Sequence, residues 1–439
     1  MDSRARMQQM HIGVFTNAMG NNAAGWQMPG ALSRADDFRS LLNIALTAER
    51  AKLDYIFFGD EPASNPDGSP GFILLLEPLT LMAALAACTS RIGLIATAST
   101  TFTEPYNLAR YVASVDQISQ GRVGWNVVTT GSEAAAKNFG RELPPHDLRY
   151  EIADEYLEVV KGPWDSWEGD ARIADKETGQ YIDRAKVHTL DHSEPYFNVR
   201  GPLGVYRSPQ GQPVIVQAGS SEAGQKFASK HAEIVFTVQQ DMDEAKKLYA
   251  TLKRRAADCG RMPEHLNLMP GFFPIVGRTE EEAQERYEAL RRYIRPGSAL
   301  VAMSQRLGHD DMSKYPMDEA FPKLADSALG PHSHARVMYA KAQRERLSLR
   351  DIHDLFAMSR GYILAVGTAE KVADIMEEWF VQDACDGFML TPAYFPGALD
   401  QFCDLVVPEL QRRGLFRNEY AGSTLRSHFG LPEPQNRFA

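Results

Sequence analysis

Two groups of residues in this sequence have the types and spacing to do chemistry. The first follows the apolar run Val214–Gln217, where Gly219, Ser220 and Ser221 stand just before an expected helix. Backbone N–H groups and two hydroxyls would point at one place there, which is how a helix N-terminus binds phosphate. The spacing after Gly219 is not that of a P-loop, and a serine that only caps its helix is the alternative interpretation.

The second group is His146 and Tyr150, which follow Pro144 and Pro145. The prolines halt the preceding chain, and Asp147 is expected to cap the next helix. The i, i+4 spacing places an imidazole and a phenol on one side of the helix start. Imidazole is the side chain best matched to proton transfer near neutral pH, whereas the alternative is that both residues lie on the surface or cap the helix.

These residues must be positioned by regular elements, and the chain alternates apolar, β-branched runs with segments of helical period. The eight expected strands are His11–Thr16, Asp54–Asp60, Arg91–Thr100, Val123–Val128, Val214–Gln217, Ile234–Val238, Leu268–Val276 and Gly387–Leu390. The expected helices include Asp36–Lys52, Leu79–Thr89, Tyr106–Gln120, Asp147–Lys161 and Thr279–Ile294, the last with a capping box at Thr279 and Glu282. This alternation predicts an α/β fold, a closed (β/α)8 TIM barrel in preference to an open doubly wound sheet.

Two intervals between the expected strands are too long for single crossovers. Residues 131–212, after the fourth strand, and about 278–386, after the seventh, are therefore expected to be insertions. The second contains a Gly/Pro/His-rich stretch at 296–335. With no internal repeat in the sequence, we expect a single barrel domain over residues 1–439.

In a barrel of this kind, ligand groups come from residues at the C-terminal ends of the strands. Those residues are Asp60, Glu61, Thr97, Ser99, Thr100, Thr101, Asn126, Thr129, Thr130, Gly219, Ser220 and Ser221. The set is polar without the spacing of a zinc, HExxH or calcium motif. The pairs His188/His192 and His332/His334 lie in the expected insertions without further ligands nearby, so we expect no metal site.

Composition excludes several classes of function. The 439 residues include 47 Lys and Arg and 57 Asp and Glu, so the net charge of −10 repels nucleic acid and anionic membranes. The four cysteines have no metal or redox spacing. No secretory signal or membrane-spanning stretch is evident, and we expect a cytoplasmic protein with reduced thiols.

Six segments, in order from about residue 11 to 433, resemble the bacterial-luciferase-like superfamily of flavin-dependent monooxygenases. They are AERAKLDYIFFGD, EPLTLMAALAACTSRIGLIATASTTFTEPYNLAR, ISQGRVGWNVVTTGSEAAAKNFG, HDLRYEIADEYLEVVKGPWDSWE, PVIVQAGSSEAGQKFA and LRSHFGLP. The resemblance is to the branch with nitrilotriacetate, EDTA and dibenzothiophene-sulfone monooxygenases. The chain departs from that branch at Gly59, where alanine is more usual, and at Glu61, which adds a carboxylate beside Asp60.

The resemblance implies a two-component enzyme that uses reduced FMN and O2. A separate NAD(P)H-dependent flavin reductase would supply FMNH2, and a flavin C4a-hydroperoxide would transfer one oxygen atom to a small organic substrate. The residues implied to contact the flavin are Asp60, Thr97, Asn126, His146 and Tyr150, with Ser220 and Ser221 on its phosphate. His146 would be the catalytic residue that exchanges a proton with the peroxide, and the second insertion would close as a lid.

Other interpretations stay open at the level of sequence. A deazaflavin-dependent oxidoreductase of the same superfamily would transfer hydride without oxygen, and a flavin-binding protein would turn nothing over. A phosphosugar enzyme would share the barrel and the phosphate site, because fold alone does not decide function. By resemblance we expect a homodimer or homotetramer.

Overall fold

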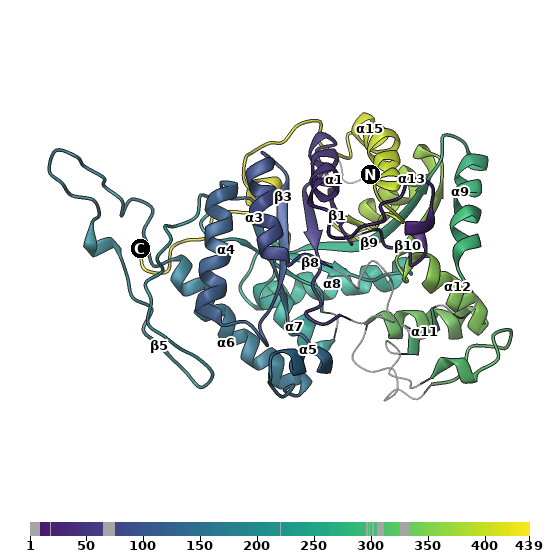
Figure 1. Ribbon diagram of the computed structural model, residues 1–439, viewed down its shortest axis with the longest axis horizontal. Helices are drawn as coiled ribbons and strands as arrows, with labels where there is room; N and C mark the ends of the chain where they lie inside the picture. Colours follow the sequence, from purple (N-terminus) through teal and green to yellow (C-terminus); the bar gives the residue numbers. More distant parts are fainter. Residues whose placement is uncertain are drawn as a thin grey trace.

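Eight parallel strands close into a barrel that helices surround, as predicted (Figure 1). The computed structural model describes residues 9–17, 19–64, 75–219, 221–295, 297, 299–300, 303–304, 311–324 and 333–439. In ring order the strands are β1 (His11–Phe15), β2 (Tyr55–Phe58), β3 (Gly93–Ser99), β4 (Val123–Val128), β7 (Val214–Gln217), β8 (Ile234–Thr237), β9 (Asn267–Val276) and β11 (Gly387–Leu390). β11 pairs with β1, which closes the ring.

Helices cover the outside of the barrel on all the sides that Figure 1 shows. The larger ones are α1 (Phe38–Arg50), α3 (Pro78–Cys88), α4 (Pro105–Ser119), α6 (His146–Trp164), α7 (Glu222–His231), α8 (Met242–Asp258), α9 (Glu280–Tyr293), α11 (Ser333–Glu345), α12 (Leu349–Ser359) and α13 (Ala369–Val381). Shorter helices are α5 (Glu133–Asn138), α14 (Gly397–Gln401), α15 (Val407–Arg412) and α16 (Leu425–His428). No helix in the described ranges is long and apolar enough to cross a membrane.

Side-chain caps begin several of these helices, and the cap expected at Thr279 is among them. The Asp37 carboxylate accepts from the Ser40 N–H at 2.9 Å at the start of α1, and Thr279 accepts from the Glu282 N–H at 3.2 Å at the start of α9. The capping box expected there is not formed, because the Glu282 carboxylate accepts instead from the N–H of Arg278 at 2.7 Å. One half of that prediction is therefore wrong.

Strand residues alternate between the barrel interior and the helical layer. Tyr55 and Phe57 of β2 point inward, where they pack with Ile95, Val214 and other interior side chains. Ile56 and Phe58 belong to the outer core between barrel and helices. This alternation decides which residues near the strand ends face the opening of the barrel.

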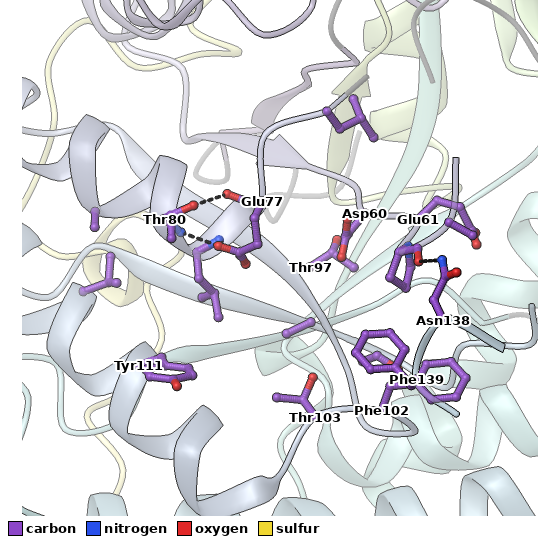
Figure 2. A pocket seen from close by; sticks show the side chains of 18 of the residues that line it. Asp60, Glu61, Glu77, Thr80, Thr97, Phe102, Thr103, Tyr111, Asn138 and Phe139 are labelled. Atoms are coloured by element: carbon purple, nitrogen blue, oxygen red, sulfur yellow. Dashed lines mark hydrogen bonds between the residues drawn. The ribbon is translucent and has the colours of Figure 1, made fainter. Parts of the chain in front are cut away.

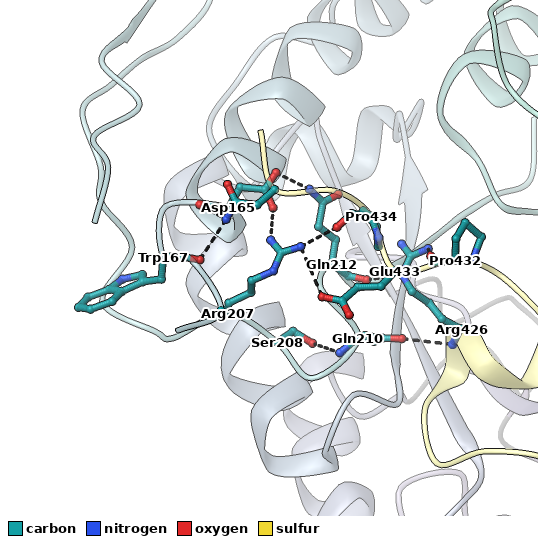
Figure 3. Close-up of polar contacts among 12 residues, drawn as sticks. Asp165, Trp167, Arg207, Ser208, Gln210, Gln212, Arg426, Pro432, Glu433 and Pro434 are labelled. Atoms are coloured by element: carbon teal, nitrogen blue, oxygen red, sulfur yellow. Dashed lines mark hydrogen bonds and ion pairs between the residues drawn. The ribbon is translucent and has the colours of Figure 1, made fainter. Parts of the chain in front are cut away.

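The insertion after β4 contains α5 and α6 and then leaves the barrel. It projects in Figure 1 as a long segment that contains the short strands β5 (His192–Ser193) and β6 (Asn198–Val199). The base of this segment is tied down by a buried ion pair between Asp165 and Arg207, and the Arg207 guanidinium also donates to the Pro434 carbonyl at 2.6 Å (Figure 3). The C-terminal segment thereby holds the insertion against the barrel.

The insertion after β9 contains a strand that the sequence did not predict. β10 (Ile363–Gly367) pairs in parallel with the second half of β9, so the sheet has one strand more than the eight in the ring. The helices α11 and α12 of this insertion share an apolar cluster of their own that includes Met338 and Ile352. A short apolar run within an interval expected to be an insertion with helices cannot be told from a buried helix segment by periodicity alone.

Candidate active site

The candidate site begins inside the mouth of the barrel, at the carboxyl ends of the strands. Thr97 of β3 and Asn126 of β4 stand opposite each other in the register of the two strands. The Asn126 amide donates to the Thr97 hydroxyl at 2.9 Å, and both side chains are 4% exposed. The amide oxygen of Asn126 has no hydrogen-bond partner among the described residues.

More unpaired polar atoms lie at the ends of neighbouring strands. They include the Thr16 hydroxyl and the Asn17 amide nitrogen after β1, and the Gln217 amide oxygen at the end of β7, all buried. A buried polar group without a partner costs about 1–3 kcal/mol, so a cluster of them indicates a polar ligand. None of the three was among the candidate site residues, although Thr16 and Gln217 end two of the expected strands.

After β7, Gly219 and Gly224 leave a space without side chains, which we call the glycine cradle. A Cβ atom at Gly219 would lie 2.2 Å from the Gln217 amide nitrogen and 2.7 Å from the Tyr150 hydroxyl, and one at Gly224 would lie 3.0 Å from the same hydroxyl. Only glycine leaves room at both positions. Ser221 caps α7, where its hydroxyl accepts from the Gly224 N–H at 3.1 Å. Ser220 lies outside the described residues.

The two groups of candidate residues predicted from the sequence meet at this cradle. His146 Nε2 lies 3.5 Å from the Ser221 hydroxyl, although the two residues are 75 positions apart. The His146 and Tyr150 rings are 5.2 Å apart on the same side of α6. Asp147 was expected to cap α6, and that prediction is wrong. Its carboxylate instead lies 2.7 Å from His146 Nδ1, and Pro145 stands at the helix start.

Arg149 stands beside this group and was not predicted from the sequence. Its guanidinium donates to the Pro144 carbonyl at 2.6 Å, and its Nε is buried without a partner among the described residues. A Cβ at Gly131 would lie 3.0 Å from its terminal nitrogen, which places the guanidinium over the chain that follows β4. Burial lowers the pKa of Arg149, and no described carboxylate pairs with it. The only hint was its place between His146 and Tyr150.

A cavity of about 840 Å³ lies on the β2 and β3 side of the mouth (Figure 2). Asp60 and Thr97 line it side by side, with Glu61 close to them. Burial, followed by the charges of Glu77 and Glu61, raises the pKa of Asp60 to about 6. Thr97 therefore links the cavity to the polar groups within the barrel.

The histidine pairs noted in the insertions make ordinary side-chain contacts where they are described. His188 Nε2 lies 2.8 Å from a Glu168 carboxylate oxygen, and His192 Nε2 lies 3.1 Å from one of Glu155. His332 and the side chain of His334 lie outside the described parts. Within those parts, no group of three or more His, Cys, Asp or Glu side chains is placed to hold a metal ion.

Comparisons with known proteins agree with this geometry. The family model of luciferase-like monooxygenases matches residues 10–386. The chain is 46% identical to N-acetyl-S-(2-succino)cysteine monooxygenase of Bacillus subtilis, with 99% of each chain covered. It is 42% identical to nitrilotriacetate monooxygenase component A of Aminobacter aminovorans, with 98% of each covered. The crystal structure of the long-chain alkane monooxygenase LadA superposes with a TM-score of 0.85 at 34% identity, covering 97% of this chain and 96% of that one.

Proposed function

Because this chain belongs to the luciferase-like monooxygenase family and is a flavin-dependent monooxygenase, we propose that it works with reduced FMN and O2. It takes FMNH2 from a separate NAD(P)H-dependent reductase and inserts one oxygen atom into a small organic substrate. The observation that carries this proposal is the set of unpaired buried polar atoms at the strand ends, together with the glycine cradle after β7.

The described residues fit a flavin mononucleotide. The unpaired amide oxygens of Asn126 and Gln217 suit the N–H groups of an isoalloxazine ring, and the cradle at Gly219 leaves room for a phosphate. Ser221 and the start of α7 would hold that phosphate together with Ser220. Reduced FMN, when bound, supplies the two electrons that activate O2.

The protein's own part in the reaction is to bind, orient and move a proton. Thr97 and Asn126 would bind polar groups of the ring, and Asp60 would contact it from the end of β2. Tyr150 fixes the ribityl phosphate end beside Ser221. The uncompensated guanidinium of Arg149 adds the positive charge that a phosphate needs in a partly buried site.

His146 is placed to transfer a proton. When Nδ1 carries the proton and donates to Asp147, Nε2 is free to accept one or to hydrogen-bond a reacting oxygen. An imidazole can donate or accept a proton through its second ring nitrogen, which is what a general acid or base must do. We therefore assign the catalytic acid–base role to His146.

The partner in this proposal is suggested by the names of two relatives. One is component A of nitrilotriacetate monooxygenase, and the other is part of a pristinamycin IIA synthase that has more than one kind of chain. Both names describe a protein that works with a second component, and a reductase is the component that reduced FMN requires. A diffusing reduced flavin meets that need without a stable complex.

The test is an anaerobic titration of the full-length protein with reduced FMN, oxidised FMN and a deazaflavin cofactor. We expect reduced FMN to bind tightest, and a later pulse of isotopically labelled O2 to place one label in the product of a screened substrate. Preference for the deazaflavin would favour an oxygen-independent oxidoreductase of the superfamily. Flavin binding without any product would favour a binding protein instead.

Matched serine variants separate phosphate binding from helix capping. Ser221→Ala and Ser348→Ala each remove the side-chain cap of a helix, α7 and α12 respectively. Both should lower the free energy of unfolding by about 1 kcal/mol. Only Ser221→Ala should weaken FMN binding, by about tenfold. Equal FMN affinity in the two variants would contradict the phosphate site.

A further inference from the structure

The cavity beside the barrel mouth has an unusual charge for its size. Its described lining contains the carboxylates of Asp60, Glu61 and Glu77 and no lysine, arginine or histidine. The three side chains come from the end of β2 and from the residue before α3, and Figure 2 shows them around one opening. A ligand that enters the cavity therefore meets negative charge only.

None of these carboxylates is neutralised by a cation in the described residues. Glu77 accepts from the N–H groups of Leu79 and Thr80 at 2.9 and 2.7 Å, which caps α3 but leaves its charge in place. Glu61 accepts from the Ser132 hydroxyl, and Asp60 accepts only from the backbone of Glu61. Burying another carboxylate among them would add repulsion in a partly desolvated site.

Uncharged side chains form the rest of the cavity wall, and its apolar and aromatic members make a continuous part of it. Phe102 and Phe139 stack with their ring centres 5.0 Å apart and their planes within 4° (Figure 2). Leu79, Val115 and Ile118 extend the apolar surface along α3 and α4. Aromatic faces attract cations as well as apolar groups, so this wall suits an organic cation.

A second feature places the inner end of the cavity beside the proposed flavin site. Thr97 lines the cavity although only 4% of its surface is exposed. It is hydrogen-bonded by Asn126, whose amide oxygen is buried and has no partner among the described residues. Through Thr97 the cavity thus reaches the polar pair beside which the flavin ring is proposed to bind, so a ligand in the cavity would lie next to the flavin.

We propose that this cavity is the substrate site of the proposed monooxygenase and that it takes an organic cation, an apolar body with a protonated amino group, and rejects carboxylates. The inference rests on the proposed function. Glu61 is the specificity-determining residue, because it adds a charge beside Asp60 without taking part in the flavin site.

The test uses two fluorinated probes that differ only in charge. 4-(Trifluoromethyl)benzylamine and 4-(trifluoromethyl)benzoate are titrated into the full-length protein at pH 7.5 and followed by fluorine NMR, with nitrilotriacetate as a competitor. We expect the amine to bind at least tenfold more tightly than the benzoate, and nitrilotriacetate not to displace it. A benzoate that binds as tightly as the amine would overturn the inference.

Two charge variants test whether the preference for the amine over the benzoate arises in the cavity. Glu61→Gln should reduce the ratio of the two dissociation constants by about threefold to tenfold, because one charge is removed at close range. Glu177→Gln removes an exposed carboxylate from the projecting insertion, away from the cavity, and should leave the ratio unchanged. An equal effect of the two variants would show that the preference arises from net charge and not from the cavity.

FMN titrations of the same samples keep the two proposals apart. Flavin binding without any preference between the probes would overturn the substrate inference alone. A preference for the amine in a protein that binds no flavin would overturn the proposed monooxygenase function, while it would support a cation site in the cavity.

Discussion

At the scale of single residues, the approach of His146 to Ser221 brings the group proposed to transfer a proton beside the one proposed to bind phosphate. The contact distance of 3.5 Å is long for a hydrogen bond, as is common before a ligand draws the groups together. The Asp147 carboxylate contacts Nδ1 of the imidazole, whereas Ser221 is near Nε2, so the short hydrogen bond of the ring is on the Nδ1 side. The two roles can therefore be separated by substitution.

His146→Ala should lower the rate of product formation by about 10²- to 10⁴-fold, the usual contribution of a positioned acid or base. The dissociation constant of reduced FMN should change by less than about threefold, because Ser221, Tyr150 and the cradle remain. Stopped-flow kinetics and anaerobic fluorescence titration measure the two quantities. His265→Ala, at the opposite end of the barrel, is the control, and unchanged turnover in His146→Ala would refute the role.

Asp60 should titrate with a midpoint near pH 6, which carbon-13 NMR of labelled aspartate can measure. Glu61→Gln and Glu77→Gln should each lower this pKa, because each removes a negative charge that disfavours the ionised form. Burial is the largest cause, so the midpoint should stay above that of an ordinary aspartate in both variants. A midpoint near 4 in the wild type would contradict the desolvated position.

The same shift has a consequence for stability with a definite sign. The folded-state pKa of Asp60 lies above its value in the unfolded chain, so between about pH 4 and 6 the native state binds more protons. The contribution of Asp60 to the free energy of unfolding therefore falls as the pH rises through this window. Asp60→Asn should flatten that part of the stability curve in urea titrations.

The sequence pointed to some of these residues and not to others, for physical reasons. Ser221 and His146 stand in local patterns, a strand that leads to a helix start and a proline-delimited i, i+4 pair, which are visible in one chain segment. Gln217 and Arg149 are notable only because their atoms lack partners in three dimensions. That property depends on what the other strands bring near them, and no local pattern records it.

At the scale of elements, all eight barrel strands were predicted within a few residues, because each is an apolar run bounded by polar turns. The errors in predicting elements occurred where tertiary contacts determine whether a strand forms or where a helix ends. β10 was missed since it pairs with the far half of a strand already used. The helix predicted at Asp147–Lys161 continues as α6 to Trp164, because its last turn packs in the core despite Pro163.

The projecting insertion depends on the ion pair of Asp165 and Arg207, which are 1% and 8% exposed. Gln212 also donates to Asp165 at 2.8 Å, so the carboxylate is fully surrounded (Figure 3). Arg207→Ala leaves that buried charge only the longer contact with Arg437, whose Nε lies 3.6 Å from Asp165, and should lower the free energy of unfolding by about 3 kcal/mol. Urea denaturation followed by circular dichroism measures the loss.

Two further variants test whether the cause is the buried charge. Lys247→Ala breaks an exposed pair with Glu244 and should cost under about 1 kcal/mol. Asp165→Leu combined with Arg207→Leu removes both charges and should recover part of the stability that Arg207→Ala loses. A double variant less stable than Arg207→Ala alone would show that packing, and not charge, holds the insertion.

At the scale of the whole molecule, the C-terminal segment closes the end of the barrel opposite the proposed active site. Leu425 and Phe429 lie in the interior cluster with Tyr55 and Ile95. We call residues 425–429 the plug. The Arg426 guanidinium holds it in place by donating to the Glu233 carboxylate at 2.6 Å and to the Gln212 carbonyl at 2.8 Å. Residues from the C-terminal segment thus complete the apolar core inside the barrel, together with side chains from β2 and β3.

The C-terminal plug fits against β3 and β4 because glycines there leave room for Leu425. A Cβ at Gly93 would lie 2.4 Å from a methyl of Leu425, and one at Gly124 would lie 3.2 Å from the other methyl. β3 and β4 therefore carry glycine where the plug enters. This pairing of residues far apart in the sequence explains why glycine stands in two strands whose other residues favour β structure.

Leu425→Ala should lower the free energy of unfolding by about 2–5 kcal/mol through the cavity it leaves, and Gly124→Ala by about 1–3 kcal/mol through crowding. Together they should cost at least about 0.5 kcal/mol less than the sum, because the truncated leucine makes room for the new methyl. Leu252→Ala, in a separate cluster, should add to Gly124→Ala without such coupling. Strict additivity in both pairs would mean that Gly124 is crowded by its strand neighbours alone. FMN affinity should be the same in every folded variant, because the plug and the glycine cradle lie at opposite ends of the barrel.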